Sequence, residues 1–203
     1  MLITKIKSID RVGKINWQPS NATGLNLIIA PHGWGKTHLM NFIMKAWVGQ
    51  AGNNLDYRIE AENSKRQMFV IGSKDQSIYS MGMNASMQSG KDGILYYPGS
   101  GRRMLHANLE FGCNMRAAAA PLADMKIGMQ NSVLIVDDAD FGLDAQNAAE
   151  YLNMLHTSAR SRGNQVIATS SRRELASLLD SSVFMLQQAD WTSLKRSLES
   201  MSD

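Results

Sequence analysis

The sequence has few of the features on which secreted and membrane proteins depend. Cys113 is the only cysteine among 203 residues, so no disulfide can form within the chain and a reducing cytosol is the expected environment. No apolar run approaches the roughly 20 residues that a membrane-spanning helix requires. Residues 1–11 alternate apolar and charged side chains and lack the apolar stretch of a signal peptide. We therefore expect a cytoplasmic protein without a membrane span.

The chain also lacks a strong charge of either sign. Lys and Arg number 21 against 18 Asp and Glu, which gives a formal net charge of +3. This excess is compatible with an acidic partner such as nucleic acid, but scattered basic pairs more often belong to a solvated surface. Hydrophobic residues make up 44% and charged residues 19% of the chain, which excludes general disorder. The length suits one domain that spans residues 1–203.

The apolar segments alternate between strand and helix patterns. Residues 2–9 and 12–17 predict an N-terminal antiparallel strand pair, and the apolar run at 25–29 predicts a strand buried on both faces. Strands that alternate with helices imply βαβ units, so we expect an α/β fold with a mainly parallel central sheet flanked by helices. The remaining segments predict a helix at 36–48, a strand at 133–136, a helix between Asp144 and Gly163, a strand at 166–169, a helix at 173–179 and a strand at 183–186.

Two parts of the chain have weaker patterns. Residues 50–101 are polar and rich in Gly, Ser and Asn, so we expect a variable, loop-rich insertion with strands near 57–61 and 68–71. Residues 73–91 have the most loop-like composition of the whole chain. At the other end, residues 187–203 predict a C-terminal helix.

A glycine-bearing loop follows the strand at 25–29 and matches the Walker A pattern of Gly, four residues, then Gly-Lys-Ser/Thr. The departure is Ala30, which can replace glycine if its φ stays below zero. Backbone N–H groups of such a loop bind phosphate oxygens, Lys36 bridges the β- and γ-phosphates, and the Thr37 hydroxyl is a Mg²⁺ ligand. A chance Gly-Lys-Thr would not be expected between a buried strand and a buried helix. The loop therefore predicts a nucleotide site made of Ala30, Pro31, His32, Gly33, Trp34, Gly35, Lys36 and Thr37.

The second motif is the apolar run at 133–136, which ends in two carboxylates. This is the Walker B pattern, in which the first carboxylate, here Asp137, holds Mg²⁺. Asp138 stands where many P-loop ATPases carry the glutamate that activates water, and its side chain is one methylene shorter. A strand followed by an acidic turn would have the same pattern, but the phosphate loop favours Walker B. We expect ATP and Mg²⁺ as cofactors, with Lys36 and Asp138 as the catalytic residues.

The segment 137–145, Asp-Asp-Ala-Asp-Phe-Gly-Leu-Asp-Ala, resembles the Asp-Glu-Pro-Thr-x-Gly-Leu-Asp-Pro run of ABC-type ATPases. Residues 162–170 are similar to the ABC segment that ends in Thr-His, and the N-terminal strands are similar to those of the soluble RecF, SMC and OLD-like branch. The matching segments lie in residues 1–50 and 129–203. The resemblance implies a P-loop ATPase whose Gly-Leu-Asp segment, which includes Asp144, crosses a dimer interface.

Several positions match the ABC pattern weakly or depart from it. Ser170 stands where the switch histidine contacts the γ-phosphate, and a serine cannot make the same contact. The signature motif is represented only by residues 98–103, in which Ser100 and Gly101 would contact nucleotide. That segment lies farther from Walker B than usual, and a surface turn describes it equally well. Gln76 is a candidate for the Q-loop residue near the metal on its position alone.

The resemblance implies an ATP-dependent homodimer in which Ser100 of one copy reaches the γ-phosphate held by the other. Such a dimer would act as a nucleotide-dependent switch on a separate effector, for example a DNA-processing protein. Because Asp138 and Ser170 replace more efficient groups, we predict slow hydrolysis and long-lived ATP states.

Two other functions are compatible with the motifs. The first is an AAA+ ATPase of the initiator or helicase-loader type, because the Gly-Lys-Thr-His-Leu segment at 35–39 is similar to those proteins. His38 of this segment is also among the residues that we expect to bind nucleotide. In that case Thr169 and Ser170 would form the polar sensor at a strand end. The second is a nucleotide-binding regulatory subunit that does not hydrolyse ATP.

Overall fold

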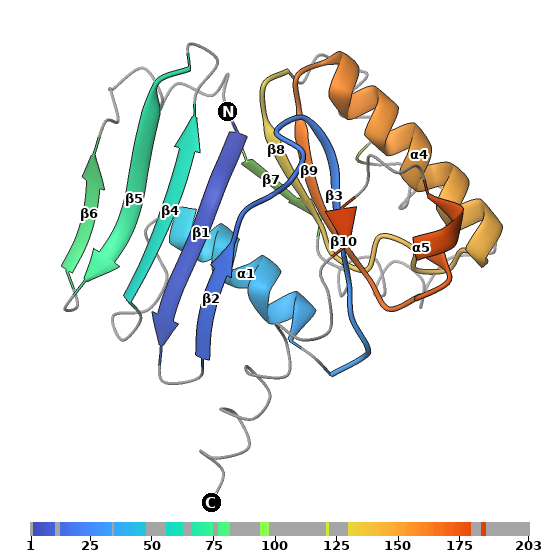
Figure 1. Ribbon diagram of the computed structural model, residues 1–203, viewed down its shortest axis with the longest axis horizontal. Coiled ribbons are helices and arrows are strands. Elements are labelled where there is room, and N and C mark those ends of the chain that lie inside the picture. Colours follow the sequence, from blue (N-terminus) through green and yellow to red (C-terminus); the bar gives the residue numbers. More distant parts are fainter. Residues whose placement is uncertain are drawn as a thin grey trace, which may run out of the picture.

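Two five-stranded sheets with helices between and beside them form the described structure (Figure 1). Figure 1 shows helix α1 (Lys36–Trp47) between the sheets, and α4 (Ala145–Ser161) and α5 (Leu175–Leu178) on the other side of the sheet that contains β3 (Gly24–Ile29). The computed structural model describes residues 2–10, 13–33, 35–47, 56–62, 66–74, 77–81, 94–97, 121, 130–179 and 184–185.

One sheet is wholly parallel and has the strand order β10-β3-β9-β8-β7. The strands predicted at 25–29, 133–136, 166–169 and 183–186 are confirmed as members of it. Strand β9 lies between β3, which leads into the phosphate loop, and β8, which carries the Walker B run. The five strands are β3 (Gly24–Ile29), β7 (Ile94–Tyr97), β8 (Val133–Val136), β9 (Gln165–Ser170) and β10 (Phe184–Met185).

The other sheet is antiparallel throughout and has the order β2-β1-β4-β5-β6. The predicted N-terminal strand pair is confirmed as β1 and β2, and it forms one side of this larger sheet. The register between β1 and β4 shifts between Ile3 and Lys5. The strands are β1 (Leu2–Asp10), β2 (Gly13–Trp17), β4 (Asp56–Glu62), β5 (Met68–Lys74) and β6 (Ser77–Met81).

The segment 50–101 holds more strand than its composition predicts. The strands expected near 57–61 and 68–71 are confirmed. In addition, β6 occupies part of the stretch 73–91, whose composition predicts a loop, and β7 was not predicted from the sequence. Strand β6 has little apolar alternation, and its pairing with β5 defines it. Strand β7 is a short apolar run that pairs with β8. The loop-rich description is therefore wrong for these two strands.

The helices predicted at 36–48, between Asp144 and Gly163, and at 173–179 are confirmed as α1 (Lys36–Trp47), α4 (Ala145–Ser161) and α5 (Leu175–Leu178). The C-terminal helix predicted at 187–203 lies outside the described residues. Asp144 caps α4 as predicted, because its side chain accepts a hydrogen bond from the Asn147 N–H. The helix ends at Ser161 with Arg162 as its C-cap, and Gly163 follows in the left-handed region with φ 67°. Among the described helices none is long and apolar enough to cross a membrane.

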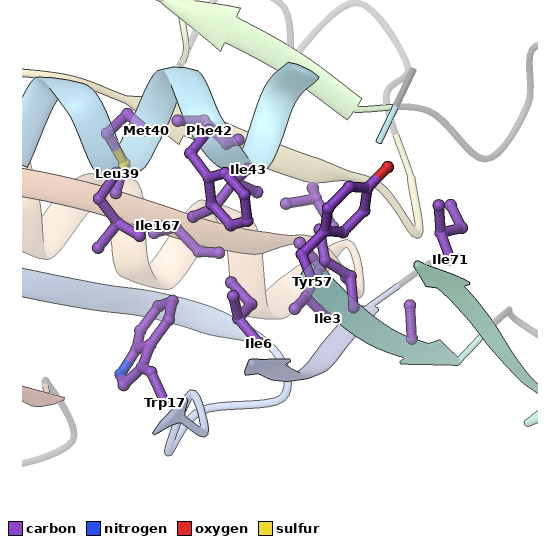
Figure 2. Packing of buried hydrophobic residues seen from close by; sticks show 14 of the residues in the cluster. Ile3, Ile6, Trp17, Leu39, Met40, Phe42, Ile43, Tyr57, Ile71 and Ile167 are labelled. Atoms are coloured by element: carbon purple, nitrogen blue, oxygen red, sulfur yellow. The ribbon is translucent and has the colours of Figure 1, made fainter. Parts of the chain in front are cut away.

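The first core fills the space between the two sheets (Figure 2). Leu39, Met40, Phe42 and Ile43 of α1 are all less than 10% exposed. The Phe42 ring meets the Tyr57 ring of β4 edge to face, with centroids 5.8 Å apart. The helix is therefore buried through these side chains, as the sequence predicts. The two sheets contribute Ile3, Ile6, Trp17, Tyr57, Ile59, Ala61 and Ile71 from one side and Ile28, Val133, Ile135 and Ile167 from the other.

The second core lies on the opposite face of the parallel sheet, under α4 and α5. Alternate residues of each strand point to opposite faces, so Val133 and Ile135 join the first core while Leu134 and Val136 join the second. This double burial explains why the strands read as continuous apolar runs. The helices contribute Ala148, Ala149, Leu152, Leu155, Ala159 and Leu175.

A buried glutamine amide joins the two sheets directly. The Gln165 side chain at the start of β9 accepts a hydrogen bond from the Ile3 N–H (2.8 Å) and donates to the Ile3 carbonyl (2.9 Å) and the Asn21 carbonyl (3.2 Å). Pairing of β2 with β1 ends at Trp17 opposite Ile6. The amide thus bonds the stretch of β1 that β2 does not reach.

Candidate functional site

The phosphate loop connects the end of β3 to the start of α1. Its first residue, Ala30, is buried, and its N–H donates to the Ser170 carbonyl at the end of β9 (3.1 Å). Gly33 and Gly35 both have φ 80°, whereas Ala30 is not among the residues with positive φ. The expected backbone of Ala30 is therefore confirmed. Left-handed residues in such a loop turn successive N–H groups toward one point, which is the geometry of an anion site.

Lys36 lies within this loop and is only 5% exposed. Its Nζ donates to the Ala30 carbonyl (2.7 Å) and to the Pro31 carbonyl (3.0 Å). Burial lowers the pKa of Lys36, while the charges of Asp138, Asp137 and Asp140 oppose that shift. The ammonium group is therefore held at the loop and faces three carboxylates.

Asp137 lies at the end of β8 and is 1% exposed. Its Oδ2 accepts a hydrogen bond from the Thr37 hydroxyl (2.7 Å), so the Walker A and Walker B residues meet as predicted. Its Oδ1 accepts a hydrogen bond from the Thr169 hydroxyl (2.7 Å). A hydroxyl and a carboxylate oxygen at one point are ligands that Mg²⁺ prefers. These residues fit the predicted metal, with the remaining ligands left to phosphate and water.

Asp138 follows at the mouth of the site in the left-handed region, with φ 47°. Its N–H donates to the Thr169 hydroxyl (2.8 Å). A cavity of about 390 Å³ opens here, large enough for several phosphate-sized groups. Among the described residues, His32, Gly33, Gly35, Lys36, Thr37 and Asp138 line it. The structure therefore brings six of the predicted site residues around one space.

An arginine just after β9 bonds the loop that follows Asp138. Arg172 Nε lies 3.0 Å from Asp140 Oδ2, and its Nη2 donates to the Leu143 carbonyl (2.7 Å). The Asp140 side chain is 7% exposed and the Arg172 side chain 36%, so the carboxylate is shielded from water while its partner reaches the surface. In the sequence Arg172 is half of the basic pair Arg172-Arg173, one of the scattered pairs that predict a solvated surface, so the sequence gives no sign of this contact.

Ser170 and Asp144, which were predicted to bind nucleotide, lie away from the phosphate loop cavity and bond other residues. Ser170 is fully buried, and its hydroxyl accepts a hydrogen bond from the Arg172 N–H (3.0 Å). Asp144 is exposed and engaged with Asn147. The backbone N–H of Asn147 lowers the pKa of Asp144, and the Asn147 side chain acts in the same direction. Neither lines the cavity at the phosphate loop.

The remaining predicted residues lie wholly or partly outside the described part of the chain. Trp34, Gln76, Ser100 and Gly101 are outside the described residues. His38 belongs to α1, but its side chain is not described. These assignments therefore stay predictions.

Comparison with known proteins connects this geometry to a class. No protein-family model matches the sequence, and no curated protein matches it. Among solved structures, the SMC head domain from Thermotoga maritima superposes with a TM-score of 0.58 at 12% identity, covering 94% of this chain and 97% of that one. An SMC head bound to the C-terminal winged-helix domain of ScpA superposes with a TM-score of 0.56 at 11% identity, covering 98% and 100%. This chain therefore shares the fold of these SMC head domains.

Proposed function

We propose that this chain binds ATP with Mg²⁺ and hydrolyses it slowly. The observation that carries the proposal is the hydrogen bond between Thr37 and Asp137, which joins the phosphate loop to the Walker B strand end. The buried Lys36 at the same loop adds the positive charge that a triphosphate requires.

The chain's own groups suggest how binding would proceed. The N–H groups of the glycine loop and the first turn of α1 would hold phosphate oxygens. Lys36 would exchange its two carbonyl acceptors for phosphate oxygens, since these carbonyls already lie at the loop. Thr37 and Asp137 would hold Mg²⁺, which shields the charge that develops on the phosphates.

Asp138 is the candidate base because its side chain lines the cavity beside Lys36 and Thr37. A base must come within hydrogen-bond reach of the attacking water, and aspartate has one methylene less than the usual glutamate. Ser170 stands at the position of the switch histidine, and its hydroxyl bonds the Arg172 N–H instead of reaching the cavity. Both features support slow turnover.

We further propose that nucleotide controls association of two copies and, through it, a separate effector protein. The resemblance of residues 137–145 to the dimer-crossing segment of ABC proteins supports this, as does the likeness to heads of SMC proteins. The five-stranded antiparallel sheet accounts for the N-terminal hairpin and favours this class over an AAA+ module.

Calorimetry tests nucleotide binding. Mg·ATP is titrated into the wild type, Lys36→Ala and the control Lys7→Ala, which removes an exposed lysine on β1. We expect binding to survive only in the wild type and the control, because the Lys36 ammonium lies at the loop whereas Lys7 lies on β1. Absence of heat from wild type with both Mg·ATP and Mg·GTP would refute the proposal.

Two further measurements test hydrolysis and assembly. Phosphate release should be far slower than the common ~10 s⁻¹ and absent in Lys36→Ala. Release that persists in the variant would exclude hydrolysis at this site. Sedimentation with ATP should show dimers, whereas rings or filaments would support the AAA+ alternative.

A further inference from the structure

The Thr169 hydroxyl lies between the two carboxylate residues of the site and is fully buried. It accepts a hydrogen bond from the Asp138 N–H (2.8 Å) and donates to Asp137 Oδ1 (2.7 Å). A hydroxyl has a single proton, and the amide must be the donor in the first bond. The proton of Thr169 is therefore committed to Asp137.

The other oxygen of Asp137 is bonded in the same way. Its Oδ2 accepts the proton of the Thr37 hydroxyl, so each carboxylate oxygen has one hydroxyl donor. The two donors come from different elements, the first turn of α1 and the end of β9. Together they fix the carboxylate plane and leave lone pairs of Thr37 for a cation.

Thr169 also fixes the backbone that follows Asp137. Its carbonyl accepts a hydrogen bond from the Ala139 N–H (2.8 Å), while its hydroxyl holds the Asp138 N–H. Asp138 lies between these two bonds in the left-handed region, which a non-glycine residue adopts only at some energetic cost. The two bonds thus hold Asp138 in the turn from which it lines the cavity.

We propose that Thr169 is a positioning residue that orients Asp137 toward Mg²⁺ and holds Asp138 at the cavity. This rests on the proposed function, because it assumes that the site takes Mg²⁺ with nucleotide. Partners that orient metal-binding carboxylates commonly contribute 10- to 100-fold to metal affinity. The hydroxyl, rather than the bulk of the side chain, carries the effect.

The test compares Thr169→Val, which keeps the shape and loses the hydroxyl, with Thr169→Ser, which keeps the hydroxyl. Thr157→Val is the matched control, since Thr157 is exposed on α4. A fluorescent ATP analogue is bound at increasing Mg²⁺ and, separately, in EDTA. We expect the half-maximal Mg²⁺ concentration to rise about 10- to 100-fold in Thr169→Val and less than about 3-fold in Thr169→Ser. Affinity in EDTA should stay within about 2-fold in all variants, because the loop and Lys36 are unchanged.

The outcomes separate this inference from the proposed function. An unchanged Mg²⁺ requirement in Thr169→Val, with Mg·ATP binding intact in the wild type, overturns the positioning role alone. An equal defect in Thr169→Ser also overturns it, because packing would then explain the effect. A wild type that binds no nucleotide overturns both. If Thr169→Val does not fold, Thr169→Cys takes its place. A rise in the half-maximal Mg²⁺ concentration between those expected for the Ser and Val variants then supports the role, and an unchanged Mg²⁺ requirement refutes it.

Discussion

Replacement of Gln165 by leucine is expected to destabilise the protein by about 4 kcal/mol. The substitution leaves the N–H and the carbonyl of Ile3 without the amide that bonds both at 2.8 and 2.9 Å. Ile3 is 1% exposed, so water does not replace these bonds freely. A buried polar group without a partner costs about 1–3 kcal/mol, and two such groups give about 2–6 kcal/mol. Leucine keeps most of the volume, so a cavity adds little.

Urea unfolding followed by circular dichroism measures the effect. For a chain of this length, about 4 kcal/mol corresponds to a fall in the thermal midpoint of roughly 8–16 °C. Gln18→Leu is the control, because Gln18 is exposed just after β2. A loss below about 1 kcal/mol in Gln165→Leu would show that the amide does not hold the two sheets together and would refute the reasoning.

Two more predictions concern the edges of the site. Arg172→Met should lower the free energy of unfolding by about 2 kcal/mol, because it leaves the buried Asp140 carboxylate without its partner. It should also slow ATP hydrolysis, because the loop at Leu143 loses its hydrogen bond to Arg172. Urea unfolding and phosphate release measure the two effects, and Arg173→Met, which changes an exposed neighbour, should show neither. Folding lowers the pKa of Asp144 through the Asn147 N–H, so the contribution of this cap is complete above about pH 4 and is lost as the pH falls through the lowered value. Asp144→Asn should therefore flatten the dependence of the melting midpoint on pH between about 5 and 2, and an unchanged slope would contradict this.

The parts of the site that sequence could predict are those tied to local pattern. Lys36 and Thr37 belong to a motif whose spacing is set by the phosphate loop, and Asp137 follows an apolar run that marks a buried strand end. Because all strands of a parallel sheet end at the same edge, the meeting of Thr37 and Asp137 could be foreseen and is confirmed, although β9 lies between their two strands.

The remaining contacts depend on which strands become neighbours. Thr169 reaches Asp137 across 32 residues because β9 inserts between β3 and β8. Arg172 reaches the Leu143 carbonyl across 29 residues for the same reason. Threonine and arginine are common at strand ends and surfaces, so neither residue type signals its partner. Strand order, rather than local preference, decides these interactions.

The position of α1 between the two sheets has a mechanical consequence. The helix starts at the lysine of the phosphate loop, and its Leu39, Met40 and Ile43 pack in a cluster to which both sheets contribute. Side chains packed at interior density leave no room for the helix to shift alone. A rotation of the first turn of α1 would therefore be resisted by side chains of both sheets, so the loop and the antiparallel sheet are mechanically connected through this shared core.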